Sequence, residues 1–144
     1  MLLSHKNQIV KKLISFQNAI QFSLALFGLF ILFHLIVILG IVFFDYVPVD
    51  YLWGGRMETK EQLMKFEIAS LLVMALCFIL VLLRRNNTKY PKIQKVLTIL
   101  FWLLSLLFLL NTIGNFLAKT YFEKFFAIAT LLLAFLSIRL ALGK

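Results

Sequence analysis

A histidine and a few carboxylates are the residues of this sequence whose types could do chemistry. His34 lies near the middle of a long apolar run, and Asp45 follows it by eleven residues. Eleven residues are close to three turns of an α-helix, so both side chains would lie on nearly the same face. Glu67 lies near the start of the next apolar run. His34 with Glu67 or Asp45 could therefore act as acid and base on a bound molecule.

The same histidine has a second interpretation, because a neutral imidazole inside a membrane can simply bond a neighbouring helix. Asn111 and Asn115 are open to the same two interpretations, structural bond or ligand contact, and share a helix face because they are four residues apart. If the apolar runs are packed helices, these groups define a polar pocket with apolar walls that opens outward. The candidate pocket residues are His34, Asp45, Trp53, Arg56, Glu67, Asn111, Asn115 and Glu123.

Strong catalytic and cofactor signatures do not occur in the sequence. Cys77 is the single cysteine and lies within an apolar run, so no disulfide framework or CxxC redox motif can form. There is no HExxH motif and no glycine-rich phosphate loop, and a lone histidine cannot make a metal site. We therefore expect no cofactor and no metal.

The elements that must position these side chains are membrane-spanning helices. The chain has 144 residues and is 62% hydrophobic, whereas soluble domains are about 45 to 50% apolar. Four apolar runs, at about 22–44, 66–83, 96–117 and 125–142, are each near the ~20 residues needed to span a bilayer. We predict an all-α, integral membrane four-helix antiparallel bundle that forms one domain over 1–144. The remaining parts are an N-terminal interfacial helix at 1–21, an outer loop at 45–65 and an inner basic loop at 84–95.

The charges predict how this bundle is oriented. The net charge is +9, but the basic residues flank the apolar runs, so they indicate topology and not a nucleic-acid partner. By the positive-inside rule, both termini and the inner basic loop face the cytoplasm, and this loop would contact anionic lipid head groups. Arg139 would reach toward the same head groups. The acidic residues are all assigned to the opposite side: Asp45, Asp50, Glu58, Glu61, Glu67 and Glu123.

Local sequence signals predict where the second helix begins and how the loop before it is held. Thr59 and Gln62 have the spacing of a capping box, and Glu61 and Lys65 that of a favourable i,i+4 pair. Arg56 is surrounded by acids in the sequence, and we expect it to pair with Asp45, Asp50 or Glu67. One helical stripe of the second span should face inward: Glu67, Ser70, Met74 and Cys77.

The fourth span carries small residues at spacings of three and four, a pattern that lets another helix approach closely. This pattern predicts a packing seam, and Glu123 extends the same face. The seam consists of Ala127, Thr130, Ala134, Ser137 and Ala141.

The first loop also carries a recognisable pattern. It reads P-x4-W-G-G-R-M from Pro48 to Met57, and an F-E pair at Phe66 and Glu67 and an N-T-x-G-N run at 111–115 follow. In these features the chain resembles small uncharacterised bacterial four-span membrane proteins. The resemblance implies a multi-pass protein of the inner (cytoplasmic) membrane, and it implies no activity.

From these observations we expect a small, non-enzymatic membrane protein. It would bind a hydrophobic or amphipathic ligand, or a partner's transmembrane helix, through the polar pocket; a homo-oligomer is open as well. One alternative is a membrane enzyme that acts on a lipid-like substrate, with His34 and a carboxylate as acid and base. A second alternative is an oligomeric ion or proton pathway, although the sequence offers few polar residues on the cytoplasmic side of His34.

Overall fold

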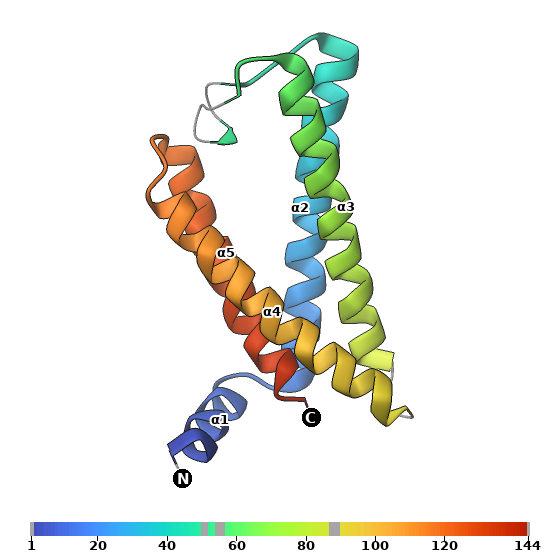
Figure 1. Cartoon of the computed structure of the whole chain (residues 1–144), viewed down its shortest axis with the longest axis vertical. Coiled ribbons are helices and arrows are strands. Elements are labelled where there is room, and N and C mark those ends of the chain that lie inside the picture. Colours follow the sequence, from blue (N-terminus) through green and yellow to red (C-terminus); the bar gives the residue numbers. More distant parts are fainter. Residues whose placement is uncertain (1, 50–51, 54–56, 87–89, 144) are drawn as a thin grey trace.

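A computed structural model of the chain describes residues 2–49, 52–53, 57–86 and 90–143. In these residues the protein is helical, and the expected all-α four-helix bundle is confirmed (Figure 1). The described segments contain no strand. The helices are α1 (Leu2–Leu13), α2 (Phe16–Phe44), α3 (Lys60–Asn86), α4 (Pro91–Phe116) and α5 (Tyr121–Ala141).

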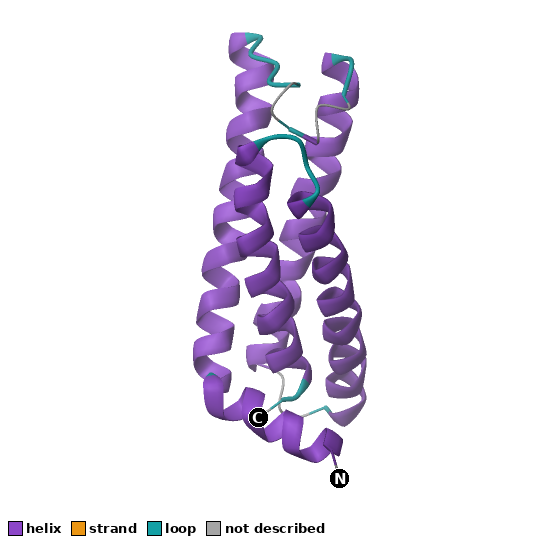
Figure 2. Cartoon of the chain, turned by 90° about the vertical axis from the view of Figure 1, so that its left-hand side faces the viewer, coloured by secondary structure: helices purple, strands orange, loops and turns teal. Residues whose placement is uncertain are grey.

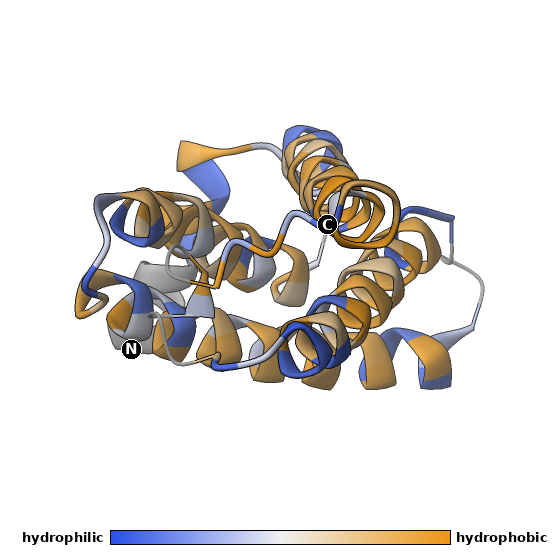
Figure 3. Ribbon diagram, turned by 90° about the horizontal axis from the view of Figure 1, so that it is seen from above, coloured by the Kyte–Doolittle hydropathy of each residue, from blue (hydrophilic) through white to orange (hydrophobic). Residues whose placement is uncertain are grey.

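The four long helices have the length and composition of membrane spans. Each of α2, α3, α4 and α5 is long and apolar enough to cross a bilayer. Large hydrophobic side chains are exposed along all four, among them Leu32 and Leu110, and Figure 3 shows hydrophobic residues on the outward faces of the bundle. Such surfaces suit contact with lipid tails, so the chain has the properties of a multi-pass membrane protein.

Capping residues explain where the first helices begin. The Ser15 hydroxyl accepts the Asn18 N–H at 3.1 Å, so α2 begins at Phe16, ahead of the expected span at 22–44. The interfacial helix expected over 1–21 is thus divided into α1 and the first turns of α2. For α3 the predicted capping box is confirmed at Thr59, whose hydroxyl accepts the Gln62 N–H at 3.2 Å.

At the start of α3, one hydrogen bond differs from the sequence pattern and one ion pair agrees with it. The side chain of Gln62 accepts the N–H of Glu58 at 3.0 Å, one residue before the partner that a capping box would use. The expected pair of Glu61 and Lys65 forms, with 2.7 Å between Oε1 and Nζ. Because of this cap, α3 begins at Lys60, as the Thr59 signal predicts, so the last part of the predicted outer loop at 45–65 is helical.

The long helices form two hairpins, α2 with α3 and α4 with α5. Figure 1 shows that the hairpins meet at one end of the bundle and diverge toward the other, and Figure 2, turned by 90°, shows the long helices running in roughly the same direction. We call the end that contains segments 45–49, 52–53 and 57–59 and the α4–α5 turn the acidic end. The end that contains α1, the end of α5 and the α3–α4 connection is the basic end. Contacts between hairpins are mainly between α2 and α5, while α3 and α4 touch little.

The apolar core lies between the hairpins. Phe27 of α2 and Phe108 of α4 are fully buried, and their ring centroids are 5.8 Å apart. All residues of the predicted small-residue seam of α5, from Ala127 to Ala141, are buried. The seam therefore faces into the bundle, as predicted. The predicted inward stripe of α3 is also confirmed, because Glu67 and Cys77 are buried and the residues between them on the stripe are half-buried.

Two arginines at the basic end are buried, which corrects the expectation that they serve as lipid anchors. Arg84 belongs to α3 and not to a loop, and its guanidinium donates to the carbonyls of Leu140 at 3.0 Å and Ala141 at 3.3 Å. Arg139 donates to the Ile14 carbonyl at 2.8 Å instead of reaching toward head groups. The physical reason is that carbonyls at helix ends and helix breaks lack a partner within their own helix, and a guanidinium can donate to several of them at once.

Candidate functional site

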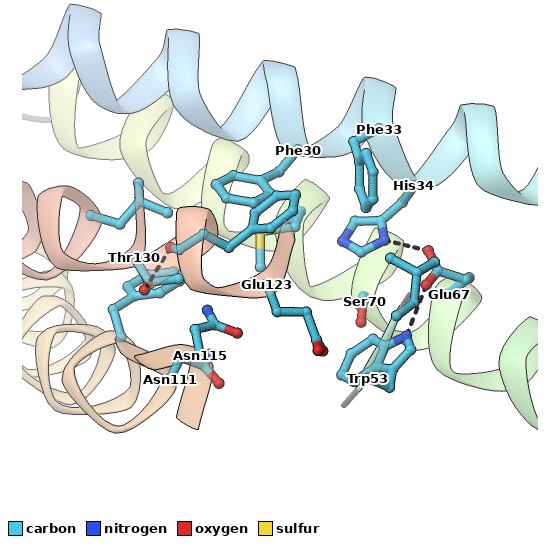
Figure 4. A pocket seen from close by; sticks show the side chains of 15 residues that line it. Phe30, Phe33, His34, Trp53, Glu67, Ser70, Asn111, Asn115, Glu123 and Thr130 are labelled. Atoms are coloured by element: carbon cyan, nitrogen blue, oxygen red, sulfur yellow. Dashed lines mark hydrogen bonds and ion pairs between the residues drawn. The ribbon is translucent and has the colours of Figure 1, made fainter. Parts of the chain in front are cut away.

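A polar cavity lies between the two hairpins in the half of the bundle nearer the acidic end. Its volume is about 170 Å³, and all four long helices and the segment 52–53 contribute to its wall (Figure 4). We call it the polar cavity. Its lining comprises Phe30, Phe33, His34, Leu52, Trp53, Glu67, Ser70, Met74, Phe108, Asn111, Asn115, Glu123, Phe126, Thr130 and Leu133.

One wall of the polar cavity is a hydrogen-bonded group of three side chains. His34 Nδ1 lies 2.6 Å from Glu67 Oε2, and the indole N–H of Trp53 donates to Glu67 Oε1 at 2.9 Å. Glu67 is only 1% exposed and His34 8% exposed. A buried carboxyl group is costly unless its oxygens are bonded, and here each oxygen has a partner.

The segment before α3 is held so that Trp53 can reach Glu67. Leu52 is buried in a small cluster with Ile41 of α2 and Leu63 of α3. Trp53 has a φ of +56°, a backbone conformation that bulky residues seldom adopt. Its ring also packs against Phe66, with centroids 5.2 Å apart. The packing of Leu52 and the bond to Glu67 together hold the tryptophan in this conformation.

The opposite wall comes from the α4–α5 hairpin. Glu123 is 8% exposed, and its Oε2 accepts the Thr120 hydroxyl at 2.9 Å. The Thr120 hydroxyl also accepts the Glu123 N–H at 3.2 Å and caps α5. In Figure 4 the Glu123 side chain extends into the space between the asparagines and Trp53. A helix N-terminus stabilises a nearby carboxylate, so this position suits Glu123.

The asparagines of α4 line the polar cavity without being deeply buried. Asn111 is exposed and Asn115 is half-buried. An interhelical side-chain bond from this part of α4 comes instead from Thr112, whose hydroxyl lies 3.0 Å from that of Thr130 on α5. Of the two interpretations of the asparagines, the arrangement favours contact with a ligand.

The structure brings together six of the eight predicted pocket residues, and Asp45 lies elsewhere. Asp45 was expected to share a face with His34, but α2 ends at Phe44 and Asp45 adopts a left-handed conformation with φ +51°. The chain turns there, so Asp45 is exposed and forms an ion pair with Lys60. Arg56 and its predicted pairing lie outside the described residues. The cavity is lined by the remaining candidates: His34, Trp53, Glu67, Asn111, Asn115 and Glu123.

Apolar walls were expected from the sequence, but the particular phenylalanines that form them were not identified. Phe126 of α5 packs against Phe30 and Phe33 of α2, with centroid distances of 5.7 and 5.4 Å. Phe30 lies four residues before His34 and therefore shares its helix face, which was a usable signal among many phenylalanines. Thr130, predicted as a packing residue, also lines the polar cavity.

A second cavity adjoins the first. It has a volume of about 310 Å³ and is lined by Phe33, Val37, Tyr46, Pro48, Leu52 and Phe122. We call it the apolar cavity because hydrocarbon and aromatic groups dominate its wall. Phe33 and Leu52 line both cavities.

No protein-family model, curated protein or solved structure matches this chain. The resemblance to small bacterial four-span proteins therefore stays a prediction, and the site has to be interpreted from its geometry.

Proposed function

We propose that this protein is a small, non-enzymatic membrane protein that binds a hydrophobic or amphipathic ligand in the polar cavity. The observation that carries the proposal is a cavity in which buried polar groups, His34, Glu67 and Glu123, face aromatic and aliphatic walls. Ligand sites generally combine mostly apolar walls with a few placed polar groups. Packing alone would not require a cavity of about 170 Å³ beside them.

The position of the polar cavity supports entry from the bilayer. It is lined by Ser70 of α3 and Asn111 of α4, and these helices touch each other little. Asn111 is exposed although it lines the cavity. A ligand dissolved in the membrane would reach the cavity between α3 and α4 without passing through water.

The location and orientation of the protein in the membrane are part of the same proposal. The excess of lysine and arginine at the basic end supports a cytoplasmic location for both termini, in the inner membrane of a bacterium. Exposed cations such as Arg85, Lys92 and Lys95 would contact anionic lipid head groups there. A partner's transmembrane helix or a second copy of the chain is the competing candidate for binding between the two hairpins, where they diverge.

Native mass spectrometry of the protein released from its own membrane, with lipid analysis of what co-purifies, tests the binding proposal. We expect one small molecule per chain, and we expect Asn111→Ala to reduce its retention. Leu110→Ala is the matched control, because Leu110 is exposed and does not line the cavity. A chain that retains nothing, or retains only another protein, would contradict ligand binding and favour a partner helix.

A second candidate function, acid–base catalysis on a lipid-like substrate, is favoured by one observation. His34 Nδ1 is 2.6 Å from Glu67, and Figure 4 shows the other ring nitrogen on the side away from Glu67. A carboxylate that accepts the Nδ1 proton leaves Nε2 free to accept one from a substrate. Of the two carboxylates considered as the partner of His34, Glu67 is therefore the one with suitable geometry.

Incubation of the purified protein with a total lipid extract would test this second function. Catalysis predicts a lipid product that forms in time and is lost in His34→Gln. His5→Gln is the matched control, since His5 and His34 are the two histidines of the chain. An unchanged lipid profile with the native protein would rule out turnover of the lipids in that extract and leave simple binding.

A further inference from the structure

His34 presents a ring nitrogen to the polar cavity that the described protein groups do not bond. The side chain lines the cavity, and Nδ1 is bonded to Glu67, whereas no hydrogen bond among the described residues engages Nε2. Every fully buried side-chain nitrogen and oxygen in the described residues has a partner, so Nε2 must be accessible from the cavity. Figure 4 shows it on the side away from Glu67. A molecule in the polar cavity therefore meets an available imidazole nitrogen.

Three more polar groups of the lining are available to a ligand. They are the hydroxyl of Ser70 and the amides of Asn111 and Asn115, which make no side-chain hydrogen bond within the part of the chain that the structure describes. A hydroxyl and an amide both donate and accept, and an imidazole nitrogen does one or the other according to its protonation. These groups are complementary to a head that also donates and accepts, as hydroxyl groups do.

The carboxyl groups of the polar cavity already bond other side chains of the protein. Both oxygens of Glu67 are bonded, one by His34 and one by Trp53. Glu123 accepts the hydroxyl of Thr120. The described lining residues include no lysine or arginine. A charged head would lose its hydration without gaining an unengaged opposite charge, which is unfavourable, so the lining favours an uncharged head.

Asn111 connects the polar cavity with the outer surface of α4. It lines the cavity and is exposed, and its neighbours Leu110 and Ile113 are exposed as well. Because α3 and α4 touch little, a head group that enters beside Asn111 leaves its hydrocarbon chain among the lipid tails. The cavity of about 170 Å³ is far larger than the ~10–15 Å³ that one water needs, so it has room for a head of several atoms.

We infer that the polar cavity binds the uncharged, hydroxyl-bearing head of a glyceride, the head group of monoacylglycerols and diacylglycerols. This inference rests on the proposed function and specifies its ligand class. The hydroxyls of the head bond Nε2 of His34 and the side chains of Ser70 and Asn111. The acyl chain extends between α3 and α4 into the bilayer.

Tryptophan fluorescence offers a direct measurement. The chain has two tryptophans, and Trp102→Phe leaves Trp53, which lines the polar cavity, as the single reporter. The protein would be placed in phosphatidylcholine nanodiscs and titrated with monodecanoylglycerol, methyl decanoate, decanoate or decyltrimethylammonium, each expressed as its mole fraction in the bilayer. Methyl decanoate is the matched control, because it keeps the ester and lacks the hydroxyls. We expect half-saturation with monodecanoylglycerol at a mole fraction about tenfold below the other three, a ratio typical of one or two hydrogen bonds.

Two pairs of variants test which side chains bond the head. Asn111→Leu removes an amide at nearly constant volume and should lower the preference for monodecanoylglycerol over methyl decanoate about threefold. Asn18→Leu, at an exposed position of α2 outside the lining, is its control. Ser70→Ala should act in the same direction. Its control is Ser105→Ala, because Ser105 lies outside the lining and bonds a carbonyl of its own helix.

Nitrogen NMR tests the contact with His34 itself. His5→Gln leaves His34 as the single histidine of the chain, and isotope-labelled histidine then reports its two distinct ring nitrogens. At constant pH, monodecanoylglycerol should shift the Nε2 resonance more than that of Nδ1, which is bonded to Glu67. Methyl decanoate, which has no hydroxyl to donate, should leave both resonances in place.

The outcomes distinguish this inference from the function on which it rests. Tighter binding of decanoate or decyltrimethylammonium would overturn the uncharged head and keep amphiphile binding. Equally tight binding of methyl decanoate, or an Nε2 resonance that does not move, would overturn the hydroxyl contacts and also keep amphiphile binding. Equal effects of Asn111→Leu and Asn18→Leu would overturn the assignment of the head to the polar cavity. Saturable binding of none of the four probes would overturn both proposals.

Discussion

The two ends of the bundle use buried polar side chains in opposite ways. At the basic end, Arg84 and Arg139 donate to backbone carbonyls of other segments. At the acidic end, His34, Trp53 and Glu67 bond one another through their side chains around a cavity. The basic end joins the two hairpins, while the bonds at the acidic end lie within the α2–α3 hairpin and line a cavity between the hairpins.

This difference predicts that the polar side chains of the two ends contribute unequally to stability. Carbonyls at a helix terminus have no partner within their own helix, so the arginine that binds them stabilises the fold. Side chains that bond only one another could be replaced by apolar groups of similar shape with little loss of stability. Their presence beside a cavity therefore suggests a role beyond folding, and substitutions at the two ends should have different consequences.

The largest effect is expected for Arg84→Ala. Besides the carbonyls of Leu140 and Ala141, the guanidinium contacts the Gln94 carbonyl at 3.2 Å and the Thr98 hydroxyl at 3.1 Å. Its loss removes the hydrogen bonds that join α3 to α4 and to the end of α5, and we expect a loss of about 3 kcal/mol in the free energy of unfolding. Thermal unfolding in detergent would measure it.

Arg85→Ala is the control for this prediction, because Arg85 is exposed beside the buried Arg84. Surface substitutions usually change stability by less than about 0.5 kcal/mol. Equal losses for the two variants would show that the basic end is not joined through Arg84.

A smaller effect, about 2 kcal/mol, is expected for Arg139→Ala. Arg139 donates to Ile14 at the break between α1 and α2 and to the Gly143 carbonyl at 2.6 Å. It also lies over the Phe16 ring, 5.6 Å from the centroid. Limited proteolysis should show faster cleavage near Ser15 in this variant, and unchanged cleavage would contradict the role of Arg139 in holding α1. Lys124→Ala, at an exposed position of α5, is the control.

At the acidic end, His34→Gln should cost no more than about 1 kcal/mol of stability, because glutamine can still make a side-chain bond between helices. The same variant should lose retained ligand if the polar cavity is a binding site. Thermal unfolding and native mass spectrometry on one preparation would test both expectations. A loss of stability as large as that of Arg84→Ala would remove the distinction between the ends.

The smallest effect is expected for Asp45→Asn, which removes the charge that pairs with Lys60. Both side chains are largely exposed, and exposed ion pairs contribute about 0 to 1 kcal/mol. We expect a change in the unfolding midpoint near the detection limit, and we expect the binding of ligand to be unchanged. A clear loss of ligand would place Asp45 in the site despite its distance from the cavity lining.

The parts of the structure that could be predicted from the sequence are those that depend on residues close together in the chain. The four apolar spans, the cap at Thr59, the Glu61–Lys65 pair and the buried seam of α5 all depend on residues a few positions apart. His34 and Glu67 are 33 residues apart, and periodicity placed both inward but did not choose between Glu67 and Asp45. The left-handed turn at Asp45 made that choice, and the sequence has no glycine there to signal it.

The burial of the two arginines could not be predicted from the sequence, for a related physical reason. A positive charge near a membrane end usually lies at the head groups, so Arg84 and Arg139 were assigned to lipid. Whether an arginine turns inward instead depends on carbonyls of distant segments that can accept from it, such as Leu140 for Arg84 and Ile14 for Arg139. Those partners become visible only when the helices are packed. The volume of the polar cavity is likewise set by the divergence of the hairpins.

The unequal lengths of the helices connect the site to the thickness of the membrane. At about 1.5 Å per residue, α2 with 29 residues is roughly 43 Å long and α5 with 21 residues roughly 32 Å. Hydrocarbon about 30 Å thick matches α5, so the longer hairpin extends beyond the tip of the shorter one (Figure 1). A thicker bilayer would favour a steeper α4–α5 hairpin and a thinner one a greater tilt. The width of the space between the hairpins, and hence the affinity of the site, should therefore vary with lipid chain length.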